Sequence, residues 1–487
     1  MKEPSVKKNY FFNAGYQALA LIVPLVTTPY ISRVLGADGI GIQSYTSSIV
    51  AFFTLFAALG TATYATRKVG IYRENLEERS KIFWDVFALR FILSTIAIIV
   101  YLLYVIFLAD NKFIAALQAI HIVGIAVDVA WFFQGMENFK IIAIRNFFIK
   151  LVNVVFIFTV VRDKGDLWWY VFGLAFWTLL ANVTLWPSLK KLIRIRDIKY
   201  IQPFKDISII IQLFVPTIAV QIYALLDKAM IGWISNNPAE NGYYEQSEKI
   251  VKMCLVLITA LGTVTIPKIS RYYAQKKLKV VQNYIYRSYK FVWALGCALM
   301  FGIIGINFKL VPVFFGPGYE RVETLLPILS VLFLLMGINN ATGIQYLIST
   351  GRQKAYMYIV VLGGIVNIGV NALMIPFFDS VGAAIGSVMG ELVILIVEFI
   401  YVYKIKEFKI SKAFSVSRNY LIAGVFMLVI LLFTQNYLQN TLLGLMTLIG
   451  IGGICYLAIL FILKDEFLFM GINIVRVRIK KIKNYKR

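Results

Sequence analysis

The stretch ALGTATYATRK (residues 58–68) returns in the second half of the chain as ALGTVTIPKISR (residues 260–271). A second pair accompanies it upstream, because VPLVTTPY (residues 23–30) has its counterpart in VPTIAVQIY (residues 215–223). Six apolar blocks separate one copy from the other. Copies separated by an even number of membrane crossings begin on the same side, which predicts a parallel repeat with a pseudo-twofold axis along the membrane normal.

The composition around this repeat is that of a membrane protein. The 487 residues are 60% hydrophobic and 15% charged, whereas a soluble domain is about 25% charged. A helix needs about 20 apolar residues to cross a bilayer. Fourteen blocks of this kind cover residues 10–34, 40–66, 82–108, 112–135, 141–161, 166–189, 207–233, 243–267, 286–307, 322–349, 354–376, 380–403, 418–437 and 441–463.

The sequence therefore predicts an all-α integral membrane protein with about 14 transmembrane helices. Two six-helix lobes are related by the parallel pseudo-twofold, and two extra helices follow them. The expected domains are residues 1–206, residues 207–405, and residues 406–487, which end in a basic cytoplasmic tail. A duplication of this kind is typical of rocking transporters, which bind substrate between the halves.

Most of the positive charge lies in every second gap between the blocks. Lys190 and Lys191 lie in one such gap, while the intervening gap at 236–241 contains neither Lys nor Arg. Cytoplasmic loops carry the Lys/Arg excess, so both termini are expected in the cytoplasm. Because the net charge of +24 is spread over all these gaps, it favours contact with anionic lipid over nucleic acid.

Motifs of enzyme and nucleotide chemistry are missing from the sequence. It contains no GxxxxGK[ST] loop, HExxH, CxxC or GxSxG element. We therefore expect no ATP-driven motor, no catalytic residues, no metal site and no cofactor. A transporter remains, and its candidate site is sought among charges inside the spans, which are costly there and usually face a cavity or a partner.

Six basic side chains inside apolar blocks are candidates for the site. They are Arg33, Arg90, Lys150, Lys228, Lys249 and Lys252. Arg90 and Asp128 are expected at similar depths, which favours an ion pair that either gates or couples transport or locks two neighbouring helices. For Lys150 the alternative is a side chain that snorkels to the interface.

Two of these bases are expected near helix breaks. Arg33 follows Pro24 and Pro29, which should break the first helix, and Asp227 and Lys228 are neighbours in the seventh block. Broken helices expose backbone to ligands in transporters. The alternative for these residues is a charge that is tolerated near the membrane surface.

The eighth block opens with GYYEQSEKIVK (residues 242–252). Glu245 and Lys249, like Glu248 and Lys252, are spaced i, i+4, which places each pair on one helical face. They could simply support the helix. In the functional interpretation they form a polar stripe facing a cavity, where Lys binds phosphate and Glu accepts sugar hydroxyls.

Three acids are candidates for ion coupling or gating: Asp128, Asp227 and Glu391. Glu391 lies near the middle of the twelfth block, where it could carry a coupling ion or hydrogen-bond to a neighbour. Glu398 is closer to Lys404, and we expect it at the interface. In the same block GAAIGSVMG (residues 382–390) spaces small residues for close helix contact.

Four longer stretches, in register along nearly the whole chain, resemble one family. They are TPYISRVLGADGIGIQSY (residues 28–45), WFFQGMENFKIIAIRNFFIKL (residues 131–151), VPTIAVQIYALLDKAMIG (residues 215–232) and NGYYEQSEKIVK (residues 241–252). This order is similar to that of the bacterial Wzx-type polysaccharide repeat-unit flippases, which act on O-antigen, teichuronic-acid or exopolysaccharide units. They belong to the multidrug/oligosaccharidyl-lipid/polysaccharide exporter superfamily.

The resemblance implies a MATE-like fold in a bacterial cytoplasmic (inner) membrane. It also implies a task, which is moving undecaprenyl-pyrophosphate-linked oligosaccharide to the outer leaflet by alternating access, through a cationic cavity. Arg33, Lys150, Lys228 and Lys249 fall in the matching words, so the pyrophosphate is expected to bind there. Arg90 and Lys252 are added on position alone, and Glu245 and Glu248 as contacts for the sugars.

Several alternatives stay open from the sequence. A lipid II flippase would use the same chemistry, and a cation-coupled drug or metabolite antiporter would use the same fold with an acidic cavity. Na⁺, H⁺, membrane potential or downhill flux would each suit the chain as an energy source. A polysaccharide polymerase and the export machinery are candidate partners, and the sugar composition of the substrate cannot be deduced.

Overall fold

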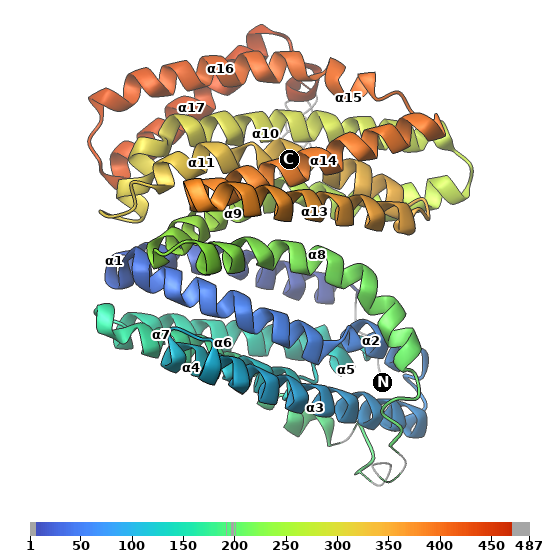
Figure 1. Ribbon diagram of the computed structural model, residues 1–487. Coiled ribbons are helices and arrows are strands. Elements are labelled where there is room, and N and C mark those ends of the chain that lie inside the picture. The colour runs from blue at the N-terminus through green and yellow to red at the C-terminus, as the bar shows by residue number, and fades with distance from the viewer. Residues whose placement is uncertain (1–5, 191, 196–198, 200, 470–487) are drawn as a thin grey trace, which may run out of the picture. The chain divides into compact units, whose positions relative to one another are not determined.

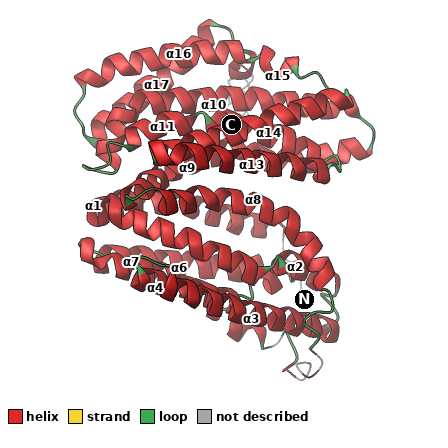
Figure 2. Ribbon diagram, in the orientation of Figure 1, coloured by secondary structure: helices red, strands yellow, loops and turns green. Residues whose placement is uncertain are grey.

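The computed structural model describes residues 6–190, 192–195, 199 and 201–469, and every regular element in these ranges is a helix (Figure 2). The chain divides into two compact units, the first ending at Glu245 and the second beginning at Gln246. Each unit is a bundle of long helices (Figure 1). The expectation of an all-α fold is confirmed.

The first unit is built on one very long helical stretch. Its elements are α1 (Val6–Ala58), α2 (Thr61–Ile71), α3 (Leu76–Phe107), α4 (Lys112–Val127), α5 (Ala130–Gly135), α6 (Phe139–Val160), the 3₁₀ turn η1 (Lys164–Asp166), α7 (Leu167–Val183), the 3₁₀ turn η2 (Trp186–Leu189) and α8 (Ile207–Ile234). Helix α1 packs against α3, α4, α6 and α8. An aromatic cluster that contains Phe83, Trp131 and Phe132, all buried, joins α3 to α5.

The second unit contains the rest of the chain. Its elements are α9 (Pro238–Ala274, which begins in the first unit), α10 (Leu278–Phe314), α11 (Val322–Ser330), α12 (Leu332–Asn339), the π-helix η4 (Asn340–Ile348), α13 (Gln353–Phe378), α14 (Ser380–Ile405), α15 (Ser411–Ser415), α16 (Ser417–Thr434), the 3₁₀ turn η5 (Gln435–Tyr437) and α17 (Leu442–Ile462). Helix α10 contacts α11, α12, α16 and α17.

Helices α13 and α14 pack closely because glycines of α14 leave room for the atoms of α13. A Cβ atom at Gly386 would stand 1.9 Å from Oδ1 of Asn371, and one at Gly382 would stand 2.5 Å from the carbonyl carbon of Met374. Only glycine allows this approach. The close contact predicted from GAAIGSVMG is therefore confirmed.

Arg352 and Glu407 form a charged cluster in the second unit. Arg352 donates to the Glu407 carboxylate at 2.5 Å and packs over the rings of Tyr273 and Tyr346. Burial of the guanidinium acts to lower the pKa of Arg352, but the hydrogen bond to Glu407 acts against burial, and the pKa lies above its ordinary value. The turn after η4 is thereby tied to the chain that follows α14.

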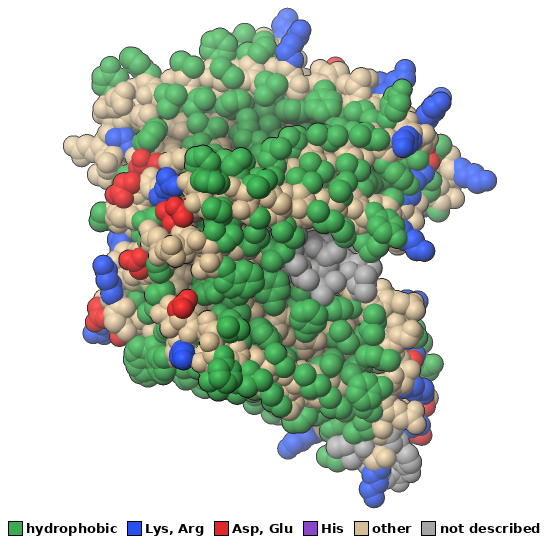
Figure 3. Space-filling view, viewed as in Figure 1, with side chains coloured by type: hydrophobic (Ala, Val, Ile, Leu, Met, Phe, Trp, Pro, Cys, Tyr) green, Lys and Arg blue, Asp and Glu red, His purple; other side chains and the backbone are tan. Residues whose placement is uncertain are grey.

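Twelve helical stretches within the described residues are long and apolar enough to cross a membrane. The first, Ile22–Ile71, has 50 residues and covers parts of two predicted blocks. Helix α8, 28 residues long, coincides with the seventh block. Hydrophobic side chains dominate the visible faces (Figure 3), as lipid contact requires.

The helix breaks differ from the expected ones. Helix α1 runs through Pro24 and Pro29, and the non-helical residue is Gly36, with φ 70° and ψ 177°. The expectation that the prolines end the first helix was wrong, because the glycine supplies the left-handed φ that a sharp turn needs. A second break falls at Gly60 (φ 65°), inside the repeated word, while its counterpart Gly262 lies within the unbroken helix α9.

The compact units do not coincide with the repeat. Helix α8 contacts α1 and α2, and so it clusters with the first unit. The repeat-based domains, residues 1–206, 207–405 and 406–487, stay a prediction, because compactness is a different criterion from internal duplication.

Candidate functional site

One buried ion pair in the first unit joins three helices. Lys228 of α8 pairs with the carboxylate of Glu245 near the start of α9, and the hydroxyl of Ser44 in α1 donates to the same carboxylate at 2.9 Å. The two charged side chains are only 15% and 13% exposed. Two residues predicted as substrate contacts are therefore brought together, with a serine that the sequence did not single out.

A second polar contact lies one residue away from this ion pair. Tyr244 donates its hydroxyl proton to Asp227 at 2.7 Å, and Asn241 donates to the backbone carbonyl of Lys228 at 3.0 Å. Asp227 is 5% exposed. The loop between α8 and α9 is thus held by hydrogen bonds in which neighbouring residues of both helices take part.

The same place contains a crossing of bare backbone. A Cβ atom at Gly41 of α1 would stand 1.7 Å from the carbonyl oxygen of Pro238, and one at Gly242 of α9 would stand 2.1 Å from that of Ala37. A Cβ at Gly232 of α8 would likewise collide with the ring of Tyr45 at 2.0 Å. Helices α1, α8 and α9 meet where their glycines remove the side chains.

This arrangement is suited to reversible contact. Helices in lipid gain little hydrophobic energy by associating, so small residues and polar bonds decide whether they hold together. Here glycines bring the backbones of α1 and α9 together, and the Lys228–Glu245–Ser44 group supplies specific polar bonds. We refer to the group and the crossing at Gly41 and Gly242 as the latch.

Arg90 and Asp128 form a second ion pair in the first unit. The guanidinium of Arg90, 2% exposed as a residue, donates to the Asp128 carboxylate at 3.0 Å, to its backbone carbonyl at 2.9 Å and to the Thr61 hydroxyl at 2.6 Å. Asp128 also accepts from the backbone N–H of Ala130 at the break between α4 and α5. The geometry favours the structural alternative, in which the pair locks α2, α3 and the α4–α5 break.

The remaining bases are distributed over three helices. Lys252 pairs with Glu248 at 2.7 Å along α9, where the Lys252 side chain is 58% exposed and that of Glu248 is 15% exposed. Lys249 is half-buried on the same helix, and Lys150 is half-buried in α6. Arg33 is exposed on α1 and donates to the carbonyl of Pro29 at 3.2 Å. Their predicted role as pyrophosphate contacts stays a prediction.

Two acids lie buried in α14. Asn339 donates to the Glu391 carboxylate at 2.6 Å and to its backbone carbonyl at 3.0 Å. Glu391 therefore makes a hydrogen bond to a neighbouring residue, which was one of the two interpretations of this residue. Glu398 was expected at the interface, which was wrong, because it is fully buried and its carboxylate lies against Gly343 of the π-helix. A charge count along the chain could not show that Gly343 of η4 and Tyr356 of α13 lie beside this carboxylate.

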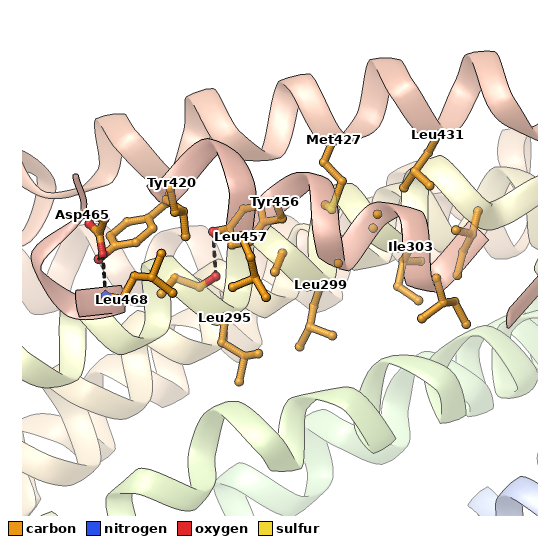
Figure 4. A pocket seen from close by; sticks show the side chains of 18 of the residues that line it. Leu295, Leu299, Ile303, Tyr420, Met427, Leu431, Tyr456, Leu457, Asp465 and Leu468 are labelled. Atoms are coloured by element: carbon orange, nitrogen blue, oxygen red, sulfur yellow. Dashed lines mark hydrogen bonds between the residues drawn. The ribbon is translucent and has the colours of Figure 1, made fainter. Parts of the chain in front are cut away.

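An apolar groove runs along α10, α16 and α17 in the second unit (Figure 4). Its volume is about 830 Å³, and side chains such as Leu299, Ile303 and Met427 form its walls. Tyr420 and Asp465, which are hydrogen-bonded at 3.2 Å, lie at one end. The two helices outside the repeat therefore form a groove against α10 that accepts hydrocarbon and little else.

Sequence reasoning missed Ser44, Tyr244 and the two glycines of the latch. Gly41 and Gly242 both lie in words that carried the family resemblance, but glycine inside a span is common enough that only the coordinates show which ones meet. Ser44 carried no signal, because a lone serine in an apolar helix is usually satisfied by its own backbone.

Comparison with known proteins gives concordant results. The family model described as "Polysaccharide biosynthesis protein" matches residues 6–273, more than half of the chain. The chain is 22% identical over 392 residues to the "Putative O-antigen transporter" of Escherichia coli (strain K12), a match that covers 78% of this chain and 92% of that protein.

Among solved structures, the "Lipid II flippase MurJ, inward closed conformation" is similar to the chain with a TM-score of 0.72 and 15% identity. That match covers 94% of this chain and 100% of the other. An inward-facing MATE family multidrug resistance transporter of the MOP superfamily follows with a TM-score of 0.59 and 15% identity, covering 79% of this chain and 97% of its own. At such identities these similarities establish the fold, which confirms the MATE-like architecture.

Proposed function

The chain belongs to the polysaccharide biosynthesis protein family, and on that premise we propose that it is a flippase for lipid-linked oligosaccharides. Its cargo is an undecaprenyl-pyrophosphate-linked repeat unit, moved from the cytoplasmic to the outer leaflet of the bacterial inner membrane by alternating access. The relative that is named an O-antigen transporter and the fold shared with a lipid II flippase support this proposal.

The single observation that carries the mechanism is the latch. An ion pair that joins α1, α8 and α9 across a crossing of glycines is a contact that can form and break. By the charge pattern it lies at the outer end of these helices. When the latch is closed, substrate reaches the protein from the cytoplasmic leaflet, and when it opens, substrate leaves to the outer leaflet.

The charges of the spans fit an anionic cargo. A pyrophosphate in a low-dielectric interior needs cationic partners, because an unpaired buried charge costs several kcal/mol or more. Arg33, Lys150, Lys228 and Lys249 are the bases we propose for it, and Lys228 would exchange Glu245 for a phosphate oxygen as the latch opens. Substitution of Lys249 or Arg33 by Ala should abolish polymer export while the protein stays folded in the membrane.

The apolar groove along α10, α16 and α17 is suited to bind the lipid part of the cargo. An isoprenoid chain has no hydrogen-bonding groups, and the walls around Leu299 and Ile303 have almost none to offer. Gly453 of α17 lines the groove, and an added Cβ there meets nothing within 4 Å, so Gly453→Phe should place its ring in the groove. Gly450 also has open space but does not line the groove, which makes Gly450→Phe the matched control. Loss of flipping in the first variant alone would support the groove, and equal activity in both would refute it.

Gene deletion tests the proposed function directly. A strain without this protein should accumulate undecaprenyl-linked repeat units in the inner leaflet and lose the corresponding surface polymer. Unchanged surface polymer without accumulation would contradict the proposal. In proteoliposomes, a labelled lipid-linked oligosaccharide, lipid II and a cationic drug are offered in parallel, so that the two rival substrates of this fold are distinguished from the proposed one.

A further inference from the structure

A cleft separate from the latch and from the apolar groove opens in the first unit between α6 and the end of α7. Its volume is about 490 Å³. The lining residues are Lys140, Ile141, Ile144, Arg145, Phe148, Ile149, Thr184 and Leu185. Two cations therefore stand beside a wall that is otherwise mostly hydrocarbon.

The guanidinium of Arg145 is held in a fixed orientation. It donates to the carbonyl of Ala181 at 2.9 Å and, through two nitrogens, to the side-chain oxygen of Asn146 at 3.0 and 2.7 Å. Thr184 donates to the same carbonyl of Ala181 at 2.8 Å. These oxygen atoms belong to Asn146 of α6 and Ala181 of α7, and they orient the guanidinium beside the cleft.

Lys140 supplies the second positive charge of the cleft. It is exposed in the first turn of α6, about 7.5 Å along the axis from Arg145, and has no hydrogen bond or ion pair with any residue in the described part of the chain. Phe148 (59% exposed) and Ile144 (38% exposed) lie further along the helix and face outward. An outward apolar surface on a spanning helix meets lipid tails.

We propose that this cleft binds the phosphate of an anionic glycerophospholipid from the cytoplasmic leaflet. The phosphate lies between Lys140 and Arg145, and the upper parts of the acyl chains pack on Ile144 and Phe148. Basic pockets between helices at the cytoplasmic side are suited to such headgroups. The two cations suit a phosphate and the apolar wall suits acyl chains, and the proposal does not depend on which substrate is transported.

Lipid binding by the purified full-length chain tests the proposal without any transport assay. Native mass spectrometry from detergent micelles would measure the affinity for dioleoyl phosphatidylglycerol. Dioleoylglycerol, with the same chains and no phosphate, and dioleoyl phosphatidylcholine, with no net charge, serve as comparison lipids. Lys140→Gln is the central variant because it removes no hydrogen bond or ion pair to the residues that the structure describes, and Lys140→Gln with Arg145→Gln removes both charges.

Each cation near a membrane surface contributes enough that Lys140→Gln should weaken phosphatidylglycerol binding about fivefold and the double variant about thirtyfold. The matched control is Lys112→Gln, an exposed lysine at the other end of the same unit, which should bind like the wild type. Equal binding of dioleoylglycerol, or no loss in Lys140→Gln, would overturn the proposal. Undecaprenyl phosphate binding more tightly than phosphatidylglycerol through the same two residues would overturn the phospholipid as the occupant.

Discussion

Substituting Gly242 by Ala places a methyl group inside the latch. The new Cβ would stand 2.1 Å from the carbonyl oxygen of Ala37. Comfortable carbon–oxygen contacts begin at about 3.3 Å, so α1 and α9 must move apart by about 1.2 Å. Overpacking of this kind costs about 1–3 kcal/mol. Because only the closed arrangement bears this cost, the equilibrium between closed and open latch should shift toward open by about 5- to 150-fold.

Distances between spin labels would report this shift. Asp38 and Asn237 are exposed residues on either side of the crossing, and labels there require a background without Cys254, Cys297 and Cys455. The wild type should give a short distance, and Gly242→Ala should move most of the population to a longer one. Export should fall as well, since a latch that stays open exposes only one side.

A control variant separates this effect from a general loss of helix packing. Gly369 of α13 has nothing within 4 Å of an added Cβ, so Gly369→Ala should leave both the label distances and export unchanged. Gly41→Ala, whose Cβ would stand 1.7 Å from the carbonyl oxygen of Pro238, should reproduce the effect from the other side of the crossing. Unaltered distance distributions in both latch variants would refute the reasoning.

Three further variants are informative. Arg90→Met leaves the Asp128 carboxylate without its cation and should lower the free energy of unfolding by about 3–5 kcal/mol, measured as a fall in melting temperature. The double variant Arg90→Met with Asp128→Asn should recover part of this loss. An unchanged melting temperature in Arg90→Met would contradict the structural role of the pair. Gly386→Ala brings a Cβ within 1.9 Å of the Asn371 side chain and should cost about 1–3 kcal/mol of stability by the same assay, whereas an unchanged melting temperature would mean that α13 and α14 separate easily. Lys228→Met should lengthen the distance between the labels at positions 38 and 237 and stop export. If neutralising Glu245 in the same variant restores the short distance, the unpaired carboxylate is the cause.

The fourteen apolar blocks could be located from the sequence because lipid leaves the backbone only one common solution. A segment of about 20 apolar residues without water must bond to itself as a helix, so hydropathy and helix position are nearly the same information. The breaks were harder. Pro24 and Pro29 suggested a break in the first helix, yet a helix in a membrane can continue past a proline. The break lies at Gly36, where the backbone has a positive φ.

The charged residues of the candidate site could be predicted from the sequence, but not all of their contacts could. The charges inside spans, such as Lys228, Arg90 and Glu391, were identified from the sequence, because a charge in lipid must have a reason. Their partners were not all identified, because the structure pairs Glu245 with Lys228 of another helix and the sequence did not predict this contact. Pairing is decided by which helices cross and at what depth, a property of three dimensions.

By itself, then, the sequence determined the membrane environment and the family and predicted a parallel repeat, because each depends on local hydropathy or on words in order along the chain. Only the tertiary structure decided that Gly41 meets Pro238 and Gly242 meets Ala37, that Glu398 is buried, and that the two extra helices form a groove. Contacts between residues far apart in the chain follow from helix packing, and one glycine or serine in an apolar helix looks like any other until its neighbours are known.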